Sequence, residues 1–156
     1  MTSPPPLLYD TYYHIYNRGI NRENIFVEER NYALFLNLYA KYVEPVAETF
    51  AYCLLKNHFH LLVRVKSEEE TLKVFFADIH HRKLRNPATR DMNPAQKPLG
   101  SDNERIHYPS KKFSDFFNAY AKAINAAYGR TGSLFQHPFG RVMVTSTGFC
   151  PGLVWR

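Results

Sequence analysis

Two histidines separated by a single residue are the side chains of this sequence best suited to chemistry. His58 and His60 flank Phe59 at the start of a mostly apolar run that extends to Val65. In a β-strand, side chains two residues apart point to the same face, so the two imidazoles would project together. Such a pair could hold a metal ion, although two nitrogen ligands do not specify which one. The alternative is that both are ordinary polar residues on a half-exposed strand.

Basic and aromatic side chains elsewhere in the chain could contact a nucleic acid. Arginine and lysine bind phosphates, and tyrosine rings stack on unpaired bases. The candidates are Arg18, Arg22, Arg141, Arg82, Lys83 and Arg85 for phosphates, and Tyr13 and Tyr16 for bases. Two alternatives stay open. The cations of residues 82–85 also complement the dipole at the end of a predicted helix, and core packing could account for at least one of the two tyrosines.

Short β-rich segments predict the strands that would carry these residues. The run 12–16 consists of aromatic and β-branched residues with one histidine, and it leads into a turn. Two further runs, 46–55 and 58–65, are separated only by residues 56–57, a spacing typical of an antiparallel hairpin. A shorter run, 141–145, alternates in the same way and could form another strand.

Apolar residues at three- and four-residue spacing predict three helices. The first spans residues 28–44 and ends before a proline, the second opens at Ser67 with a capping-box pattern, and the third covers residues 113–128. Between the second and the third, residues 86–109 carry several prolines and few large apolar side chains. This composition predicts a long mobile loop.

The predicted order of elements, strand-helix-strand-strand-helix, favours a ferredoxin-like (RRM-like) α+β sandwich. In such a fold, helices cover one face of an antiparallel sheet. Phe59 and the alternate residues after it would point toward the helices. His58 and His60 would then lie on the other face, which is free to hold a ligand.

Length and composition predict one folded domain with a polyanionic partner. The 156 residues suffice for a single core, and a hydrophobic fraction of 45% with 12 Phe and 11 Tyr argues against intrinsic disorder. The formal net charge of +6 favours a polyanion without identifying it. Cys53 and Cys150 show no CxxC spacing, and no apolar run or signal peptide indicates a membrane or secretory destination, so a cytoplasmic location is expected.

Three separated blocks of the chain resemble one protein family. Residues 52–63, with His, a bulky apolar residue and His, are similar to the signature of the HUH single-tyrosine transposases. Residues 13–26, with Tyr-His-Ile-Tyr-Asn-Arg-Gly, and residues 132–141, with Gly-Ser-Leu-Phe-Gln, are similar to blocks of its insertion-sequence and REP-associated branch. The resemblance covers roughly residues 9–147. Residues 1–8 would be a disordered leader and residues 148–156 a tail.

This resemblance implies a fold, a chemistry and partners. The family fold is the same ferredoxin-like sandwich. His58 and His60 would hold a divalent ion, magnesium or manganese, that polarises the scissile phosphate of a single-stranded, hairpin-bearing DNA. A tyrosine would attack this phosphate and become a 5′-phosphotyrosine, and the protein would act as a homodimer.

The sequence departs from the family at the nucleophile. In the family this tyrosine, and often a third metal ligand, stand on a helix after a Phe-x-Arg segment, whereas the sequence has no tyrosine after Tyr128. Tyr120 and Tyr128 are the remaining candidates, and their spacing predicts burial instead. Three functions stay open: an enzyme that nicks and rejoins single-stranded DNA, a non-catalytic remnant that binds single-stranded DNA or RNA, and an RNA-binding ferredoxin-like domain. The last is disfavoured because its Arg/Lys-Gly-Phe pattern is absent from the central strands.

Overall fold

The computed structural model describes residues 4–85 and 101–145, except for the side chains of residues 83 and 84. It contains strand β1 (Tyr12–Arg18), the short 3₁₀ helix η1 (Ile20–Arg22), helix α1 (Glu29–Tyr42), strands β2 (Ala47–Leu55) and β3 (His58–Val65), helices α2 (Glu68–Arg85) and α3 (Asp102–Tyr128), and strand β4 (Gly140–Met143). None of these helices is both long and apolar enough to cross a membrane.

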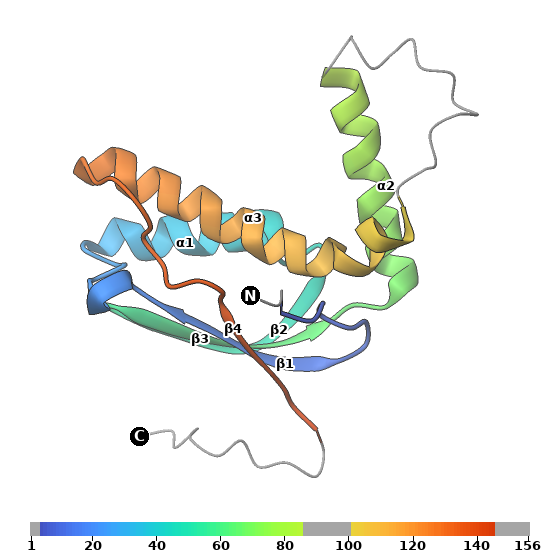
Figure 1. Ribbon diagram of the computed structural model, residues 1–156, viewed down its shortest axis with the longest axis horizontal. Coiled ribbons are helices and arrows are strands. Elements are labelled where there is room, and N and C mark those ends of the chain that lie inside the picture. Colours follow the sequence, from blue (N-terminus) through green and yellow to red (C-terminus); the bar gives the residue numbers. More distant parts are fainter. Residues whose placement is uncertain (1–3, 86–100, 146–156) are drawn as a thin grey trace.

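The four strands form one antiparallel sheet in the order β2-β3-β1-β4. Figure 1 shows α1 and α3 over one face of this sheet, whereas α2 stands away from it. Within the described residues no helix covers the opposite face, which we call the open face. The fold is therefore α+β with an antiparallel sheet, as the sequence predicted.

The core lies between the sheet and helices α1 and α3, and β3 shows how it forms. Phe59, Leu61, Val63 and Val65 are at most 2% exposed, whereas the residues between them are half-buried. Phe35 of α1 packs on Phe59, with ring centroids 5.1 Å apart. Burial of each large apolar side chain contributes about 1.5–3 kcal/mol. This burial decides which residues of β3 remain for the open face.

Helix α3 begins earlier than the sequence predicted, because residues 102–109 are helical and not part of a loop. Ser101 caps the helix by accepting a hydrogen bond from the Glu104 backbone N–H. In return, the Glu104 carboxylate accepts one from the Ser101 backbone N–H. This capping box satisfies two N–H groups that would otherwise be unpaired. The rest of the predicted loop, residues 86–100, lies outside the described residues.

Pro109 is buried inside α3, where a proline normally disrupts the helix because it has no N–H for the carbonyl four residues earlier. That carbonyl belongs to Arg105. The Tyr9 hydroxyl donates a hydrogen bond to it at 2.7 Å. A residue near the start of the chain thus supplies the donor that Pro109 lacks, and the helix continues.

Part of the predicted leader also belongs to the folded domain. Leu7 is only 1% exposed and packs in the main core, and its backbone N–H donates to the Ser110 hydroxyl at 2.9 Å. A disordered leader was expected because this segment contains three consecutive prolines. The buried Leu7 side chain and its backbone hydrogen bond hold it on the domain. Residues 1–3 and the predicted tail, 148–156, lie outside the described residues.

Helix α2 contacts α3 through a second, smaller apolar cluster and through an ion pair between Asp78 and Lys112. Val46, Phe75 and Tyr108 form this cluster. Beside it, the Asp78 carboxylate accepts hydrogen bonds from the Tyr108 hydroxyl at 2.6 Å and from Lys112 Nζ at 3.0 Å. Burial alone would raise the pKa of Asp78, but these two bonds, together with the positive charges of Lys112 and Arg82, outweigh burial and hold the pKa below its usual value. The ionised carboxylate therefore stabilises the folded state.

Replacing Asp78 with asparagine should lower the free energy of unfolding by about 1–2 kcal/mol, because the Lys112 side chain, only 10% exposed, loses its counter-ion. The folded-state pKa lies below the unfolded value of 3.8. The contribution is therefore present above pH 3.8 and disappears as the pH falls through the folded value. Urea unfolding of both proteins at about pH 7 and about pH 3 measures this dependence.

The matched control is Asp115→Asn, which breaks the Lys111–Asp115 pair within α3, whose lysine is more exposed than Lys112. It should cost less than about 0.5 kcal/mol. Equal losses in the two variants would show that Asp78 does not anchor α2.

Candidate functional site

The pairing of β1 with β3 places both predicted histidines on the open face. Tyr16 lies opposite His60, and Arg18 lies opposite His58. The two histidines are half-buried, while Phe59 between them is fully buried on the helix side. The expectation that both rings share one face of a central strand is confirmed. Their role as metal ligands stays a prediction.

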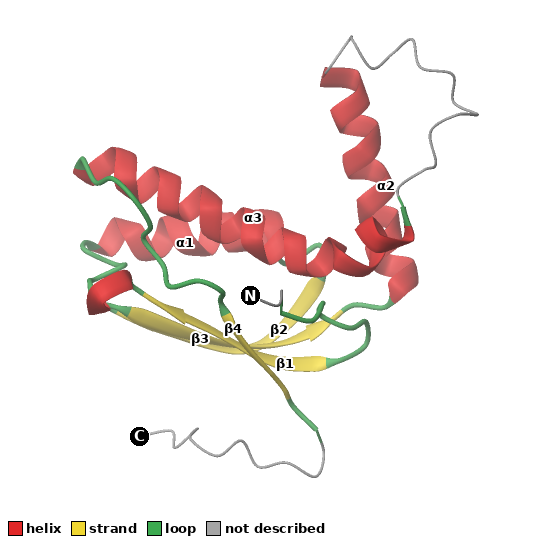
Figure 2. Cartoon of the chain, viewed as in Figure 1, coloured by secondary structure: helices red, strands yellow, loops and turns green. Residues whose placement is uncertain are grey.

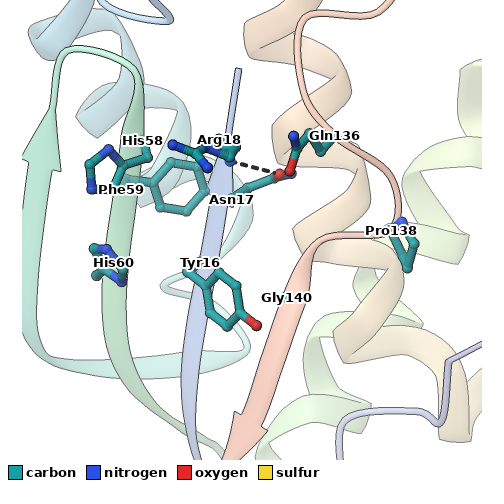
Figure 3. A pocket seen from close by; sticks show the side chains of 9 residues that line it. All are labelled: Tyr16, Asn17, Arg18, His58, Phe59, His60, Gln136, Pro138 and Gly140. Carbon is teal, nitrogen blue, oxygen red and sulfur yellow. Dashed lines mark hydrogen bonds between the residues drawn. The ribbon is translucent and has the colours of Figure 1, made fainter. Parts of the chain in front are cut away.

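A pocket of about 400 Å³ opens beside the two histidines (Figure 3). Its walls come from β1, β3, the start of β4 and the loop that precedes β4. This loop returns the chain from the end of α3 to the sheet (Figure 2). The Gln136 backbone N–H ties the loop to β1 by donating to the Arg18 carbonyl at 3.0 Å. The lining residues are Tyr16, Asn17, Arg18, His58, Phe59, His60, Gln136, Pro138 and Gly140.

The hairpin tip that carries His58 is held by backbone hydrogen bonds from the turn after β1. The Asn57 carbonyl accepts the Gly19 N–H at 2.9 Å, and the Lys56 carbonyl accepts the N–H groups of residues 25–26 at 2.8 and 2.9 Å. Gly19 is required here, because a Cβ atom would lie 2.1 Å from a backbone oxygen of the same turn. These hydrogen bonds fix the position of the His58 backbone, although His58 lies directly after a hairpin turn.

One ring nitrogen of His58 is committed to a hydrogen bond, and the other has no hydrogen-bond partner among the described residues. Nδ1 lies 2.7 Å from Oδ1 of Asn57. Because an amide oxygen only accepts, His58 donates from Nδ1–H and its Nε2 carries the lone pair. A second contact sets the orientation of the amide, since Asn57 Nδ2 donates to the Arg22 carbonyl at 3.4 Å. His58 thus has the tautomer that a metal ligand bonding through Nε2 requires.

His14 is a third histidine of the site, and it was not among the candidates from the sequence. Its Nε2 lies 2.8 Å from Nδ1 of His60, and the two rings are nearly parallel with centroids 5.1 Å apart. The ring centroids can be 5.1 Å apart with the nitrogens at 2.8 Å only when the two nitrogens face each other on the line between the ring centres. Such a linear arrangement is that of an N–H···N hydrogen bond. The signal in the sequence is the alternation of β1, which puts Tyr12, His14 and Tyr16 on one face.

The bond to His14 determines which groups His60 presents to the pocket. Two neutral imidazoles share one hydrogen, so either His60 donates from Nδ1 or His14 donates from Nε2. When His60 donates, its own Nε2 carries a lone pair, like that of His58. The rings of His58 and His60 are nearly perpendicular, at 88°, with centroids 5.2 Å apart. The two rings therefore adjoin each other edge to face on the open face.

All three histidines have lowered pKa values. Burial lowers the pKa of His14. Burial is also the main cause of the lowered pKa of His60, followed by the proximity of His14 and His58. For His58, burial comes first and the charge of Arg18 adds to it. Lowered pKa values favour neutral imidazoles at neutral pH, and only neutral imidazoles keep the lone pair that a metal needs.

Two of the arginines predicted to bind phosphate lie at this end of the sheet. Arg18 lines the pocket, and its Nε is buried with no hydrogen-bond partner in the described part of the chain. Leaving a buried donor unpaired costs about 1–3 kcal/mol, which a phosphate oxygen would offset. Arg22 is exposed and has a left-handed backbone, with φ of +61°. Arg18 is therefore placed to meet an anion in the pocket, whereas Arg22 is not among the lining residues.

The arrangement can hold a divalent ion through two imidazoles. Among residues 4–85 and 101–145, no group of three or more His, Cys, Asp or Glu side chains is positioned around one point. Hard divalent ions commonly keep several waters and take further oxygens from a bound phosphate. Two imidazoles would leave the remaining coordination positions of such an ion to water or to a bound anion.

Two other predicted contact residues face the helices and not the pocket. Tyr13 is only 5% exposed and forms part of the core. Arg141 lies opposite Ile15 on the helix side, where its guanidinium stacks on the Phe139 ring at 3.9 Å and donates to the Pro5 carbonyl at 3.0 Å. Both side chains are engaged in packing. Neither residue is among those that line the pocket.

The cations predicted on the second helix are also remote from the pocket. Arg82 and Arg85 are exposed near the end of α2, which points away from the sheet (Figure 1). The side chain of Lys83 lies outside the described residues. These residues could add to the positive charge of the surface, but they do not form one site with His58 and His60.

The two candidate nucleophiles belong to the helix layer. Tyr120 is fully buried, and its hydroxyl donates to the Ile25 carbonyl at 2.7 Å. The Tyr128 hydroxyl donates to Oδ1 of Asn31 at 3.2 Å. The expectation that both residues have packing roles agrees with these contacts. Neither hydroxyl reaches the pocket, which lies on the other side of the sheet.

No protein-family model matches this chain, and no curated protein matches it. The function of the site is therefore inferred from its own residues and from the resemblance in the sequence.

Replacing His14 with leucine should weaken Mn²⁺ binding about tenfold, because His60 loses the partner that holds its ring and the hydrogen at Nδ1. Glutamine at position 14 carries a carbonyl oxygen with a similar reach and should restore part of the affinity. Titration of the protein with Mn²⁺, followed by electron paramagnetic resonance, measures the free ion. The control is His80→Leu, an exposed histidine of α2, which should bind like the wild type. An unchanged affinity in His14→Leu would show that His14 does not orient His60.

Proposed function

We propose that this protein is a transposase-type DNA strand transferase that binds single-stranded DNA on its open face. In this proposal one phosphodiester of the strand enters the pocket, and His58 and His60 hold a divalent ion, magnesium or manganese. The resemblance of three sequence blocks to the HUH single-tyrosine transposases suggests this function. The geometry of the pocket supports it independently.

One observation carries the proposal: two imidazoles with free nitrogens and one unpartnered guanidinium N–H line a single pocket. Nε2 of His58 is free, Nε2 of His60 is free when His60 donates to His14, and Nε of Arg18 has no partner in the described part of the chain. A phosphodiester supplies the charge and the acceptor oxygens that match this set. Arg141 also has a buried Nε without a partner in the described residues, but it faces the helices, whereas Arg18 lines the pocket.

Each side chain has a distinct task in this proposal. Arg18 donates a charge-assisted hydrogen bond to a phosphate oxygen and orients the ester. His58 and His60, held by Asn57 and His14, present lone pairs from one side of the sheet. The bound ion would supply Lewis-acid stabilisation of the charge that develops on the phosphate.

The fold supports the same proposal. Read from its other edge, the strand order β2-β3-β1-β4 becomes 4-1-3-2, with every neighbouring pair antiparallel. We propose that this is the ferredoxin-like arrangement, in which α2 and α3 together replace the second helix. The open face of such a sheet can present aromatic and basic side chains to unpaired nucleotides.

A second candidate function is binding of single-stranded DNA or RNA without catalysis. The observation that favours it is the position of Tyr120 and Tyr128, whose hydroxyls are bonded within the helix layer. Formation of a 5′-phosphotyrosine needs a nucleophile at the pocket. The homodimer and the hairpin-bearing substrate that the resemblance implies stay predictions of the first function.

Single-stranded DNA should bind more tightly than duplex, and its affinity should fall steeply with salt. A chain with a net charge of +6 releases counterions when its arginines contact phosphates, so the logarithm of affinity falls linearly with that of salt concentration. Fluorescence anisotropy with a labelled hairpin-bearing strand and with a fully paired duplex measures both effects. Arg18→Gln should reduce the salt slope by about one.

The control for this measurement is Arg30→Gln, which removes an exposed arginine of α1 on the helix side. It should leave the slope unchanged. Equal affinity for the two forms of DNA, with no salt slope, would argue against any transposase-like role.

The 156-residue chain should bind a cleavable strand yet form little covalent adduct with it, because Tyr120 and Tyr128 do not reach the pocket. The assay is incubation with a labelled hairpin-bearing strand and manganese, followed by a denaturing gel that retains only covalent species. Tyr120→Phe, Tyr128→Phe and Tyr16→Phe identify the source of any adduct. A robust adduct that disappears in one of these variants would contradict the prediction and identify the nucleophile.

A further inference from the structure

Tyr16 lies flat on the backbone of β4 at Gly140. A Cβ atom added to Gly140 would stand 2.2, 2.3 and 2.6 Å from Cζ, Cε2 and Cε1 of the Tyr16 ring. Three such similar distances put that atom over the face of the ring and not at its edge. Gly140 is directly opposite Tyr16 in the pairing of β1 with β4. The ring therefore occupies the space that a side chain at position 140 would take.

The other face of the Tyr16 ring is turned toward solvent. Tyr16 is 39% exposed although Gly140 covers one side of its ring. The rings of His14 and His60 lie beside it, with centroids 5.0 and 6.1 Å away and interplanar angles of 30° and 28°. Figure 3 shows Tyr16 at the wall of the pocket between His60 and Gly140. Tyr16 thus forms a flat aromatic surface next to the groups that would bind a phosphate.

We propose that the Tyr16 ring, lying on Gly140, is the binding site for one unpaired nucleobase, whose nucleotide places a phosphate in the adjoining pocket. An aromatic ring with one free face binds a base by stacking, with little dependence on the identity of the base. For the phosphate, this inference rests on the proposed function. It adds the contact that holds the base.

The spacing along β1 connects the base with the phosphate. Tyr16 and Arg18 share one face and are separated by two residues, about 7 Å along the strand. A phosphate and the base of a neighbouring nucleotide in the same strand can span this distance. A strand that places a phosphate at Arg18 therefore brings a neighbouring base over Tyr16.

A stacking site of this kind selects single strands. In a duplex, each base is covered on both faces by its neighbours, and it must leave the stack before another ring can contact its face. An unpaired nucleotide needs no such step. The Tyr16 ring therefore favours a strand with unpaired bases at the phosphate that enters the pocket.

Gly140 provides a way to remove the flat surface without removing the tyrosine. A methyl group at position 140 would overlap the ring face, so Tyr16 would have to rotate away from β4. Alanine at position 140 should therefore abolish base stacking while all groups that contact the phosphate remain.

Strands that carry 2-aminopurine at one position each, in a series along the sequence, test the inference. With the 156-residue protein, emission should change on binding at one or two adjacent positions only. Tyr16→Phe keeps the ring and should keep the emission change and the affinity. Tyr16→Leu and Gly140→Ala should lose the emission change and bind about tenfold more weakly. The matched control is Val142→Ala, two residues further on the same face of β4, which should behave like the wild type.

The outcomes separate this inference from the proposed function. Wild-type affinity and emission in both Tyr16→Leu and Gly140→Ala would overturn the base site and leave the proposed function standing. Loss of the emission change in Tyr16→Phe would also overturn it, because the hydroxyl and not the ring face would then make the contact. Failure of the wild type to bind the strand would overturn the proposed function and the base site together. If circular dichroism shows that Gly140→Ala does not fold, the emission change in Tyr16→Leu decides.

Discussion

The register between β1 and β3 is the constraint on which the rest of the site depends. Ile15 and Leu61 lie opposite each other and are both buried against the helices, so the residues next to them must face the other way. A slip of one residue would turn every side chain of a strand to the opposite face. His60 and Arg18 would then enter the core, and large apolar residues would be exposed. The hydrophobic free energy of the core, about 1.5–3 kcal/mol for each large side chain, thus holds the polar site in position.

The strands and the first two helices could be predicted because burial of one face leaves a regular period in the sequence. The predicted segments 46–55 and 58–65 agree with β2 and β3 to within one residue, since a two-residue turn restricts the register of a hairpin. The start of α3 could not be predicted in this way. Pro109 argues for a loop, and the donor that replaces its missing N–H belongs to Tyr9, which is 96 residues from the carbonyl that it serves. Local pattern contains no information about such a partner.

The candidate site was predictable within one strand and not between strands. His58 and His60 share β3, so spacing alone brings their rings to one face. His14 joins them only through the pairing of β1 with β3, a long-range relation that periodicity does not express. The alternation of β1 does separate Tyr13 from Tyr16, because residues three apart on a strand face opposite sides. The same rule turns the arginine of β4 toward the helices and removes it from the open face.

The groups of the site are arranged before any ligand arrives. Asn57 and His14 each engage one ring nitrogen of a neighbouring histidine, and Gly19 allows the turn after β1 to hold the hairpin tip. Ordering a flexible side chain on binding costs about 0.5–1.5 kcal/mol, and these contacts remove that cost for the imidazoles. Arg18 differs from the histidines, because its buried Nε has no hydrogen-bond partner in the part of the chain that the structure describes. An anionic oxygen in the pocket would give this N–H an acceptor with a complementary charge. The imidazoles are thus held in place by contacts within the chain, whereas the guanidinium has an N–H that a bound phosphate would engage.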